Sequence, residues 1–149
     1  IIATPGCESN VKEIFDKTWE LKQDPTMMIF NQFAEMGNPL WHYNVTGYAL
    51  AELFEAVKKP GQSFAGACFT SGSAGTMSAG DLLKERYPQL KLAVGEALQC
   101  PTILDNGFGG HRIEGIGDKH IPWIHNVKNT DMAIAVSYTH LRAHGYRHR

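Results

Sequence analysis

Six small residues in the middle of the chain, Ser71, Gly72, Ser73, Ala74, Gly75 and Thr76, have the composition of an anion-binding loop. Residues with so little bulk allow several backbone N–H groups to converge on one anion, and the hydroxyl groups add donors. The apolar segment 64–69 predicts a strand before the loop, and residues 77–86 predict a helix after it, whose positive end attracts the same anion. The loop has neither the Lys of a Walker loop nor the three glycines of a dinucleotide-binding loop, so it predicts a phosphate-monoester site. The alternative is a plain strand-to-helix connection.

A second segment of unusual composition lies between residues 107 and 117. It holds five glycines: Gly107, Gly109, Gly110, Gly115 and Gly117. A loop so rich in glycine either turns sharply or lets a ligand approach the backbone closely. It is therefore a second candidate binding surface.

Other arrangements that carry chemistry are weak in this sequence. Histidines and acidic residues form one loose group along the chain: His111, Glu114, Asp118, His120 and His125. No pair in it has the His-x-x-x-His spacing of a helical zinc site, so we expect no metal there. The cysteines are far apart: Cys7, Cys68 and Cys100. They form no Cys-x-x-Cys pair, which favours reduced thiols in a reducing compartment.

The composition narrows the class of protein. The 149 residues include 14 basic and 15 acidic side chains, a net charge of −1, whereas a nucleic-acid-binding domain normally has a basic excess. The hydrophobic content of 43% is that of a globular protein, and no apolar run is long enough to cross a bilayer. Because the first residue is Ile1 and not Met, we expect a chain that is processed or incomplete at its start.

The elements expected around the two loops alternate between helix and strand. Apolar residues at three- and four-residue steps predict a helix over residues 8–22, and its buried stripe is expected at Val11, Ile14, Phe15 and Trp19. Further helices are expected at 46–57 and 77–86. Strands are expected at 1–4, 27–30, 64–69, 90–97 and 132–136. This order favours an α/β fold with a mainly parallel sheet.

Several segments resemble, in the same order, the cysteine synthase and cystathionine β-synthase family, whose members are pyridoxal phosphate (PLP) enzymes of fold type II. Residues 71–76 resemble the loop that binds the cofactor phosphate. The other segments are Thr4-Pro5-Gly6; Asn31-Gln32-Phe33 with Gly37-Asn38-Pro39, His42 and Thr46-Gly47; Gly95-Glu96-Ala97; and His111-Arg112-Ile113-Glu114-Gly115-Ile116-Gly117 with Ile121-Pro122. The resemblance extends from residue 1 to about residue 136.

The resemblance implies a fold and a set of roles. The fold would be the three-layer, mainly parallel α/β architecture of the tryptophan synthase β-like type, incomplete in this chain. Residues 1–40 would end the smaller domain, and residues 41–136 would belong to the larger, cofactor-binding domain. Residues 71–76 would bind the PLP phosphate, and Gln32 the substrate carboxylate. Gly115, Ile116 and Gly117 would line the other side of the cofactor.

Two features of the sequence bear on these roles. Ala74 stands where the family usually has glycine, and we expect its φ to be negative because an added methyl disfavours the left-handed region. The Lys that forms the Schiff base with PLP precedes this segment in the family. None of the nine lysines here is in a comparable setting, so no catalytic residue is assigned.

The basic, His-rich residues 137–149 resemble translated sequencing-adapter sequence, and a non-native tail is expected there. The alternative is a tail that binds metal or an acidic surface.

The resemblance implies a cytoplasmic enzyme, commonly a homodimer, that performs β-replacement or β-elimination on a small amino-acid substrate without nucleic-acid or membrane partners. The alternatives are another fold type II activity (a dehydratase or a tryptophan synthase β-like enzyme) and a non-catalytic α/β module that binds a phosphorylated ligand. The 149 residues alone are expected to be inactive.

Overall fold

A computed structural model describes residues 1–5, 12–107, 109–111, 113 and 115–137 of the chain. Three strands form one sheet: β1 (Gly66–Thr70), β2 (Lys91–Ala97) and β3 (Met132–Val136). The helical elements are α1 (Lys12–Leu21), α2 (Gly37–Trp41), the π-helix η1 (His42–Gly47), α3 (Tyr48–Val57), α4 (Met77–Arg86), α5 (Thr102–Asp105) and the 3-10 helix η2 (Val127–Asn129).

The sheet is parallel throughout, with the order β1-β2-β3. Thr70 at the end of β1 is paired with Gly95, and Val136 at the end of β3 is paired with Ala97. The carboxyl ends of all three strands therefore meet at one edge. The expected α/β fold with a parallel sheet is confirmed.

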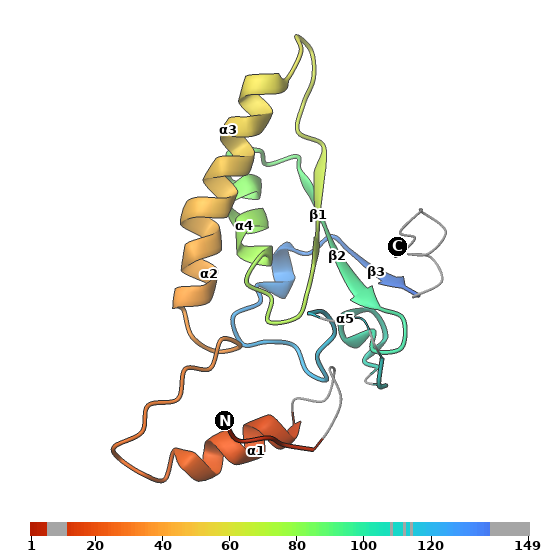
Figure 1. Cartoon of the computed structure of the whole chain (residues 1–149). Helices are drawn as coiled ribbons and strands as arrows, with labels where there is room; N and C mark the ends of the chain where they lie inside the picture. Colours follow the sequence, from red (N-terminus) through yellow and green to blue (C-terminus); the bar gives the residue numbers. More distant parts are fainter. Residues whose placement is uncertain (6–11, 108, 112, 114, 138–149) are drawn as a thin grey trace, which may run out of the picture.

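One face of the sheet is covered by two layers of helix. Figure 1 shows α2, η1 and α3 running on as one long rod, with α4 between this rod and the strands. The rod approaches α4 closely at Gly47, where an added Cβ would lie 2.7 Å from Leu82 Cδ2. One turn further along α4, the guanidinium of Arg86 lies 4.2 Å from the centroid of the Tyr48 ring.

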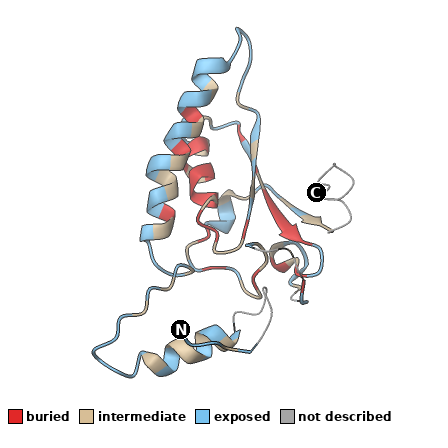
Figure 2. Ribbon diagram, viewed as in Figure 1, coloured by how far each residue is buried: buried red, intermediate tan, exposed pale blue. Residues whose placement is uncertain are grey.

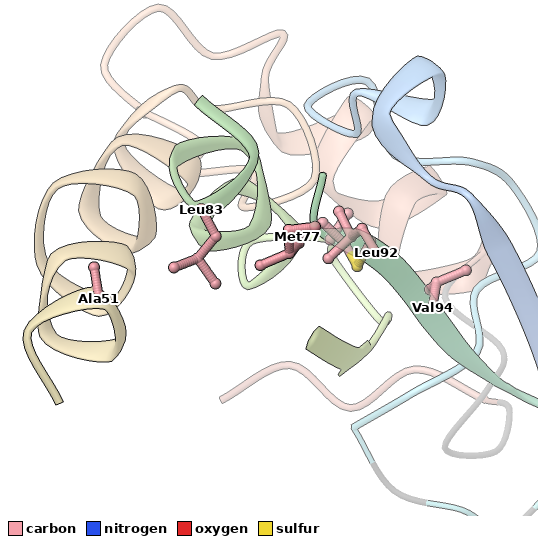
Figure 3. Packing of buried hydrophobic residues seen from close by; sticks show 7 residues of the cluster. Ala51, Met77, Leu83, Leu92 and Val94 are labelled. Atoms are coloured by element: carbon pink, nitrogen blue, oxygen red, sulfur yellow. The ribbon is translucent and has the colours of Figure 1, made fainter. Parts of the chain in front are cut away.

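The hydrophobic core forms where α4 meets the sheet and the rod. Buried residues concentrate in α4 and β2 (Figure 2). Figure 3 shows Ala51, Met77, Leu83, Leu92 and Val94, which belong to one packed cluster. Gly80 allows the close packing of α4 on the strand, because a Cβ there would lie 2.5 Å from Leu92 Cδ1.

The element bounds agree closely with the sequence in the larger part of the chain. The expected helix 77–86 and strand 132–136 coincide with α4 and β3, and the expected strands 64–69 and 90–97 correspond to β1 and β2 within two residues. No helix was predicted at the positions of α2, α5 or η2. In the structure, α2 and η1 extend the helix expected at 46–57 toward the N-terminus.

The expectations for the first 40 residues are less accurate. Segments 1–4 and 27–30 form no strand, and Met28 and Phe30 are 76% and 83% exposed because no strand lies beside them. Helix α1 lies within the expected range 8–22, but its apolar stripe is not buried: Ile14 and Trp19 are 50% and 60% exposed. Val11 falls outside the described residues.

No helix in the described part of the chain combines the length and the apolar character that crossing a membrane requires.

The carboxylate of Asp131, just before β3, links that strand to β2 and α4. Asp131 accepts a hydrogen bond from the Leu92 amide at 2.8 Å, forms an ion pair with Lys84 of α4, and lies 3.1 Å from Lys91 Nζ. The hydrogen bond from Lys84 is the main cause that holds the pKa of Asp131 well below its usual range. A carboxyl with a depressed folded-state pKa stabilises the fold above its unfolded pKa, and this contribution is lost as the pH falls.

We therefore expect Asp131→Asn to lower the Tm of the whole protein at neutral pH. The difference from the wild type should shrink below about pH 4, where the unfolded carboxyl becomes protonated. Thermal unfolding followed by circular dichroism across pH 3–8 measures this, with exposed Asp105 replaced by Asn as the control. A difference that stays constant with acid would contradict the assignment.

Candidate functional site

The loop 71–76 begins where β1 ends and leads directly into α4. The amide of Ser71 continues the sheet by donating to Gly95 O at 3.2 Å, and from Met77 onward the amides donate within the first helical turns. Between them, the amides of residues 72–76 have no acceptor within the described chain. Five consecutive free donors next to the N-terminus of a ten-residue helix make this segment suitable for an anion.

The three hydroxyl groups of the loop are in different situations. Thr76 Oγ1 donates to Thr70 O at 3.2 Å, so its proton is used within the loop. Ser73 Oγ accepts from Asn38 Nδ2 at 3.1 Å, which leaves its own proton available to another acceptor. Ser71 is a buried residue, 7% exposed, so its hydroxyl is less accessible than that of Ser73. Ser73 is thus the hydroxyl best placed to donate to a bound anion.

Asn38, at the start of the helical rod, links two parts of the candidate site. Its Nδ2 donates both to Ser73 Oγ at 3.1 Å and to Gln32 O at 2.8 Å. Its Oδ1 lies against Gly75, where an added Cβ would be only 2.1 Å away. Asn38 belongs to one of the resembling segments, but no role could be predicted for it, because a contact across 35 residues has no local signal.

His42, one turn further along the rod, borders the same glycine. A Cβ on Gly75 would lie 2.9 Å from His42 Cδ2, and His42 Nδ1 is 2.9 Å from Thr46 Oγ1. The loop is therefore held from outside by side chains of the rod, and glycine at position 75 is required by this close approach.

The expectation for Ala74 is wrong. Its φ is +63°, in the left-handed region, and the residue is 1% exposed within the core cluster. Turning from β1 into α4 within this short loop requires the left-handed conformation here, at a cost of about 1–2 kcal/mol for an L-residue with a Cβ. The same constraint explains why glycine is more usual at this position in the family.

The glycine loop 115–117 lies directly against the loop 71–76. Gly117 N donates to Ser71 O at 2.9 Å, and a Cβ on Gly72 would lie 2.6 Å from Gly115 O. Gly115 and Gly117 both have positive φ, +75° and +78°, while Ile116 between them is half-buried. Gly117 also leaves room for the His111 ring, since a Cβ there would lie 2.2 Å from Nε2.

The structure thus brings together all three segments that the sequence singled out. The side chain of Gln32 is exposed, and its backbone is held beside Ser73 through Asn38. Arg112 and Glu114 fall outside the described residues.

Glu96 is a buried acid near this edge; it belongs to one of the resembling segments but had no predicted role. Glu96, in β2, is 3% exposed and accepts from the amides of Ile103 and Leu104 at 2.7 and 3.0 Å. It therefore holds the turn around α5 in place and is satisfied by these bonds. Within the described residues, no three His, Cys, Asp or Glu side chains converge as metal ligands would.

The donor set fits the phosphate of PLP. A phosphate monoester needs several amide or hydroxyl donors around its oxygens, and residues 72–76 offer five amides and the Ser73 hydroxyl on a helix N-terminus. The facing glycines 115 and 117 carry no side chain that would occupy the space beside the loop.

Comparison with known proteins gives a consistent set of relatives. Over 137 residues the chain is 30% identical to a cysteine synthase of Staphylococcus aureus, a match that takes in 91% of this chain and 42% of that protein. The structure of a hydrogen sulfide-producing enzyme from Fusobacterium nucleatum superposes with a TM-score of 0.74 at 26% identity, over 84% of this chain and 37% of that one. An O-acetylserine dependent cystathionine β-synthase from Helicobacter pylori superposes at 0.71 and 25% identity, over 87% and 40%.

The chain spans about two fifths of the length of these relatives. No family model matches it.

The parallel sheet, the small-residue loop after β1 and these likenesses define part of an α/β fold of the tryptophan synthase β-like type, the architecture of fold type II PLP enzymes. Within that class, the chain is similar to cysteine synthases and to a cystathionine β-synthase over about nine tenths of its own length.

The contact between Gly75 and the rod can be tested in the whole protein. Gly75→Ala places a methyl group against Asn38 Oδ1, so we expect a loss of stability of about 1–3 kcal/mol from overpacking. The matched control is Gly37→Ala, because a Cβ at position 37 meets nothing within 4 Å. Urea unfolding of the two variants measures the difference. Equal stabilities would contradict the close packing of the loop on the rod.

Proposed function

We propose that the protein to which this chain belongs is a PLP-dependent, cysteine synthase-like enzyme that carries out β-replacement or β-elimination on an amino acid. The observation that carries the proposal is the row of five amides at residues 72–76, free within the described chain, at the N-terminus of α4. The relatives support it, since one is a cysteine synthase and another an O-acetylserine dependent cystathionine β-synthase.

The roles proposed for this chain are binding and orientation. The amides of residues 72–76 and the Ser73 hydroxyl hold the cofactor phosphate, and the dipole of α4 favours its negative charge. The glycines of residues 115–117 leave one side of the site open. The exposed amide of Gln32 binds the substrate carboxylate.

PLP, when bound, supplies an electron sink for the electrons released at the α-carbon of the amino acid. Asn38 positions two of the proposed binding groups, since it donates to Ser73 Oγ and to Gln32 O at the same time. The Lys of the Schiff base is proposed to come from another part of the protein. We further propose that the boundary between the smaller and the larger domain falls near residue 40, and that the enzyme is a cytoplasmic homodimer.

Ser73→Ala tests the phosphate site. Removing the hydroxyl deletes one hydrogen bond to a charged group, so we expect the Kd for PLP of the whole protein to rise roughly tenfold. Ser63→Ala is the matched control, because Ser63 is exposed in the segment before β1. The Kd is measured by titrating the apoprotein with PLP and following the absorbance of the Schiff base.

The same protein must form a β-substituted amino acid from O-acetylserine and either sulfide or an organic thiol, detected by mass spectrometry. A whole protein that neither gives a Schiff-base band nor forms product would refute the proposed function.

A further inference from the structure

A carboxylate and an imidazole form a pair directly after the glycine loop. Asp118 Oδ1 lies 3.4 Å from His120 Nδ1 and accepts from the amide of Lys119 at 2.8 Å. The Asp118 side chain is 3% exposed, and its Oδ2 is buried with no hydrogen-bond partner in the described chain. The side chain of His120 is 40% exposed. One member of the pair is therefore fixed inside the protein while the other reaches out of it.

Contacts to the backbone carbonyl of Asp118 hold this residue in place. Its carbonyl oxygen accepts a hydrogen bond from the Thr102 hydroxyl and lies 3.4 Å from Cys100 Sγ, both in the segment that follows β2. Burial raises the pKa of the Asp118 carboxyl, and the neighbouring His120 opposes that rise. The negative charge at position 118 is thus stabilised when His120 carries a proton.

The ring of His120 lies at the wall of a cavity of about 500 Å³. It packs on Phe15 of α1 and on Phe33, with ring centroids 5.4 and 6.1 Å away. Trp19 and Trp123 line the same cavity. Because Nδ1 of His120 faces Asp118, Nε2 lies on the opposite edge of the imidazole, away from the carboxylate.

Chain neighbours link this cavity to the segments of the proposed substrate site. Asn31 and Phe33, the neighbours of Gln32 in the chain, both line it. In addition, His120 is three residues beyond Gly117, whose amide is bonded to Ser71 O at 2.9 Å. Gln32 itself lines a smaller cavity that shares Asn31 and Phe33 with this one, so a molecule in the larger cavity lies near Gln32.

We propose that His120 is the general base for an organic thiol bound in this cavity, and that Asp118 is the residue that positions it. The inference rests on the proposed function and names its second substrate. The aromatic side chains among its walls and this volume suit a thiol with an apolar substituent better than the small sulfide ion.

The proposed step is a proton transfer joined to the formation of a C–S bond. The S–H bond of the thiol breaks and its proton moves to His120 Nε2. The sulfur electron pair forms the bond to the β-carbon of the amino acid, from which the leaving group has already departed with its own electron pair. The π bond between the α- and β-carbons breaks at the same time, and its electron pair passes to the α-carbon, where PLP would accept it until that carbon takes up a proton. His120 returns the proton to water after product release. The 3.4 Å separation between His120 and Asp118 is of the kind that tightens when a substrate binds.

Other charged side chains also line the cavity: Lys22 from α1 and Glu35. Neither lies within ion-pair distance of His120 among the described residues, where Asp118 alone does so. Asp118 is therefore the charged group that faces the imidazole most directly.

The kinetic test uses the whole PLP-loaded protein and separates the two half-reactions. Acetate release from O-acetylserine without a thiol measures the first, and product formation on adding benzyl thiol measures the second. We expect His120→Gln and His120→Phe to slow the second roughly 100-fold and to change the first less than about threefold. His120→Phe keeps an aromatic ring on Phe15 and Phe33, so a variant with wild-type rates would reduce His120 to packing and overturn the proposal.

A thiol that is already ionised needs no base, which gives a rescue experiment. Thiophenol is similar in size to benzyl thiol but is largely ionised at neutral pH, so its loss in His120→Gln should be less than about tenfold. Equal losses with the two thiols would contradict the proposed proton transfer. Turnover of sulfide alone, with neither organic thiol, would refute the assigned substrate class.

The positioning role of Asp118 is tested on the apoprotein without any activity. A carboxylate that accepts from Nδ1–H keeps Nε2 unprotonated in the neutral ring. The ¹⁵N chemical shifts of the His120 ring should therefore show more of the Nε2–H tautomer in Asp118→Asn, and no change in the control Asp105→Asn, whose side chain is exposed. The same tautomer in all three proteins would refute the role of Asp118.

These outcomes are distinct from failure of the proposed function. Wild-type protein that binds no PLP or releases no acetate would refute the function itself. Wild-type protein that does both, with His120 variants that add benzyl thiol at an undiminished rate, would refute the inference about His120 alone.

Discussion

The parallel pairing of β2 with both of its neighbours is the constraint on which the rest of the structure depends. Parallel strands cannot be joined by tight turns, so the chain must cross over the sheet between them. From β1 to β2 it does so through α4, which covers one face and carries much of the core. The same pairing places the loops after β1 and β2 at one edge of the sheet, where the loop 115–117 reaches Ser71.

Close packing against glycines is the second requirement, both at that edge and between the helices. Gly72 faces Gly115 O, Gly75 faces Asn38 and His42, and Gly47 faces Leu82, each at a distance that leaves no space for a Cβ. Small residues here serve packing and binding together. Atoms that press the loop from the side of the rod also hold its amides in one orientation, so that a bound anion would meet donors already arranged.

The sequence predicted what depends on local pattern and missed what depends on distant partners. Residues 77–86 and the apolar run 132–136 predicted α4 and β3 with their bounds. Helix α4 is largely buried, and β3 pairs with β2 although none of its residues is fully buried. The run 27–30 has the same apolar character but no neighbouring strand, and hydrophobicity alone does not supply one.

The same division applies to the site. Its loops could be predicted from small-residue composition. The bridge made by Asn38 and the burial of Asp118 could not, because both arise from residues that the fold brings together. The left-handed Ala74 shows a further limit, since geometry imposed by the turn into α4 overrides the usual steric preference of a residue with a Cβ.

The π-helix η1 accommodates one additional residue inside the rod. A π turn holds one residue more than an α turn, and each helical residue rotates the following side chains by about 100°. Because η1 absorbs its additional residue locally, Asn38 before it and Ala51 after it keep the faces that they would have in a regular helix one residue shorter. The start of the rod therefore contacts the loop 71–76 while its far end packs in the core, with one residue more between them than a regular helix would hold.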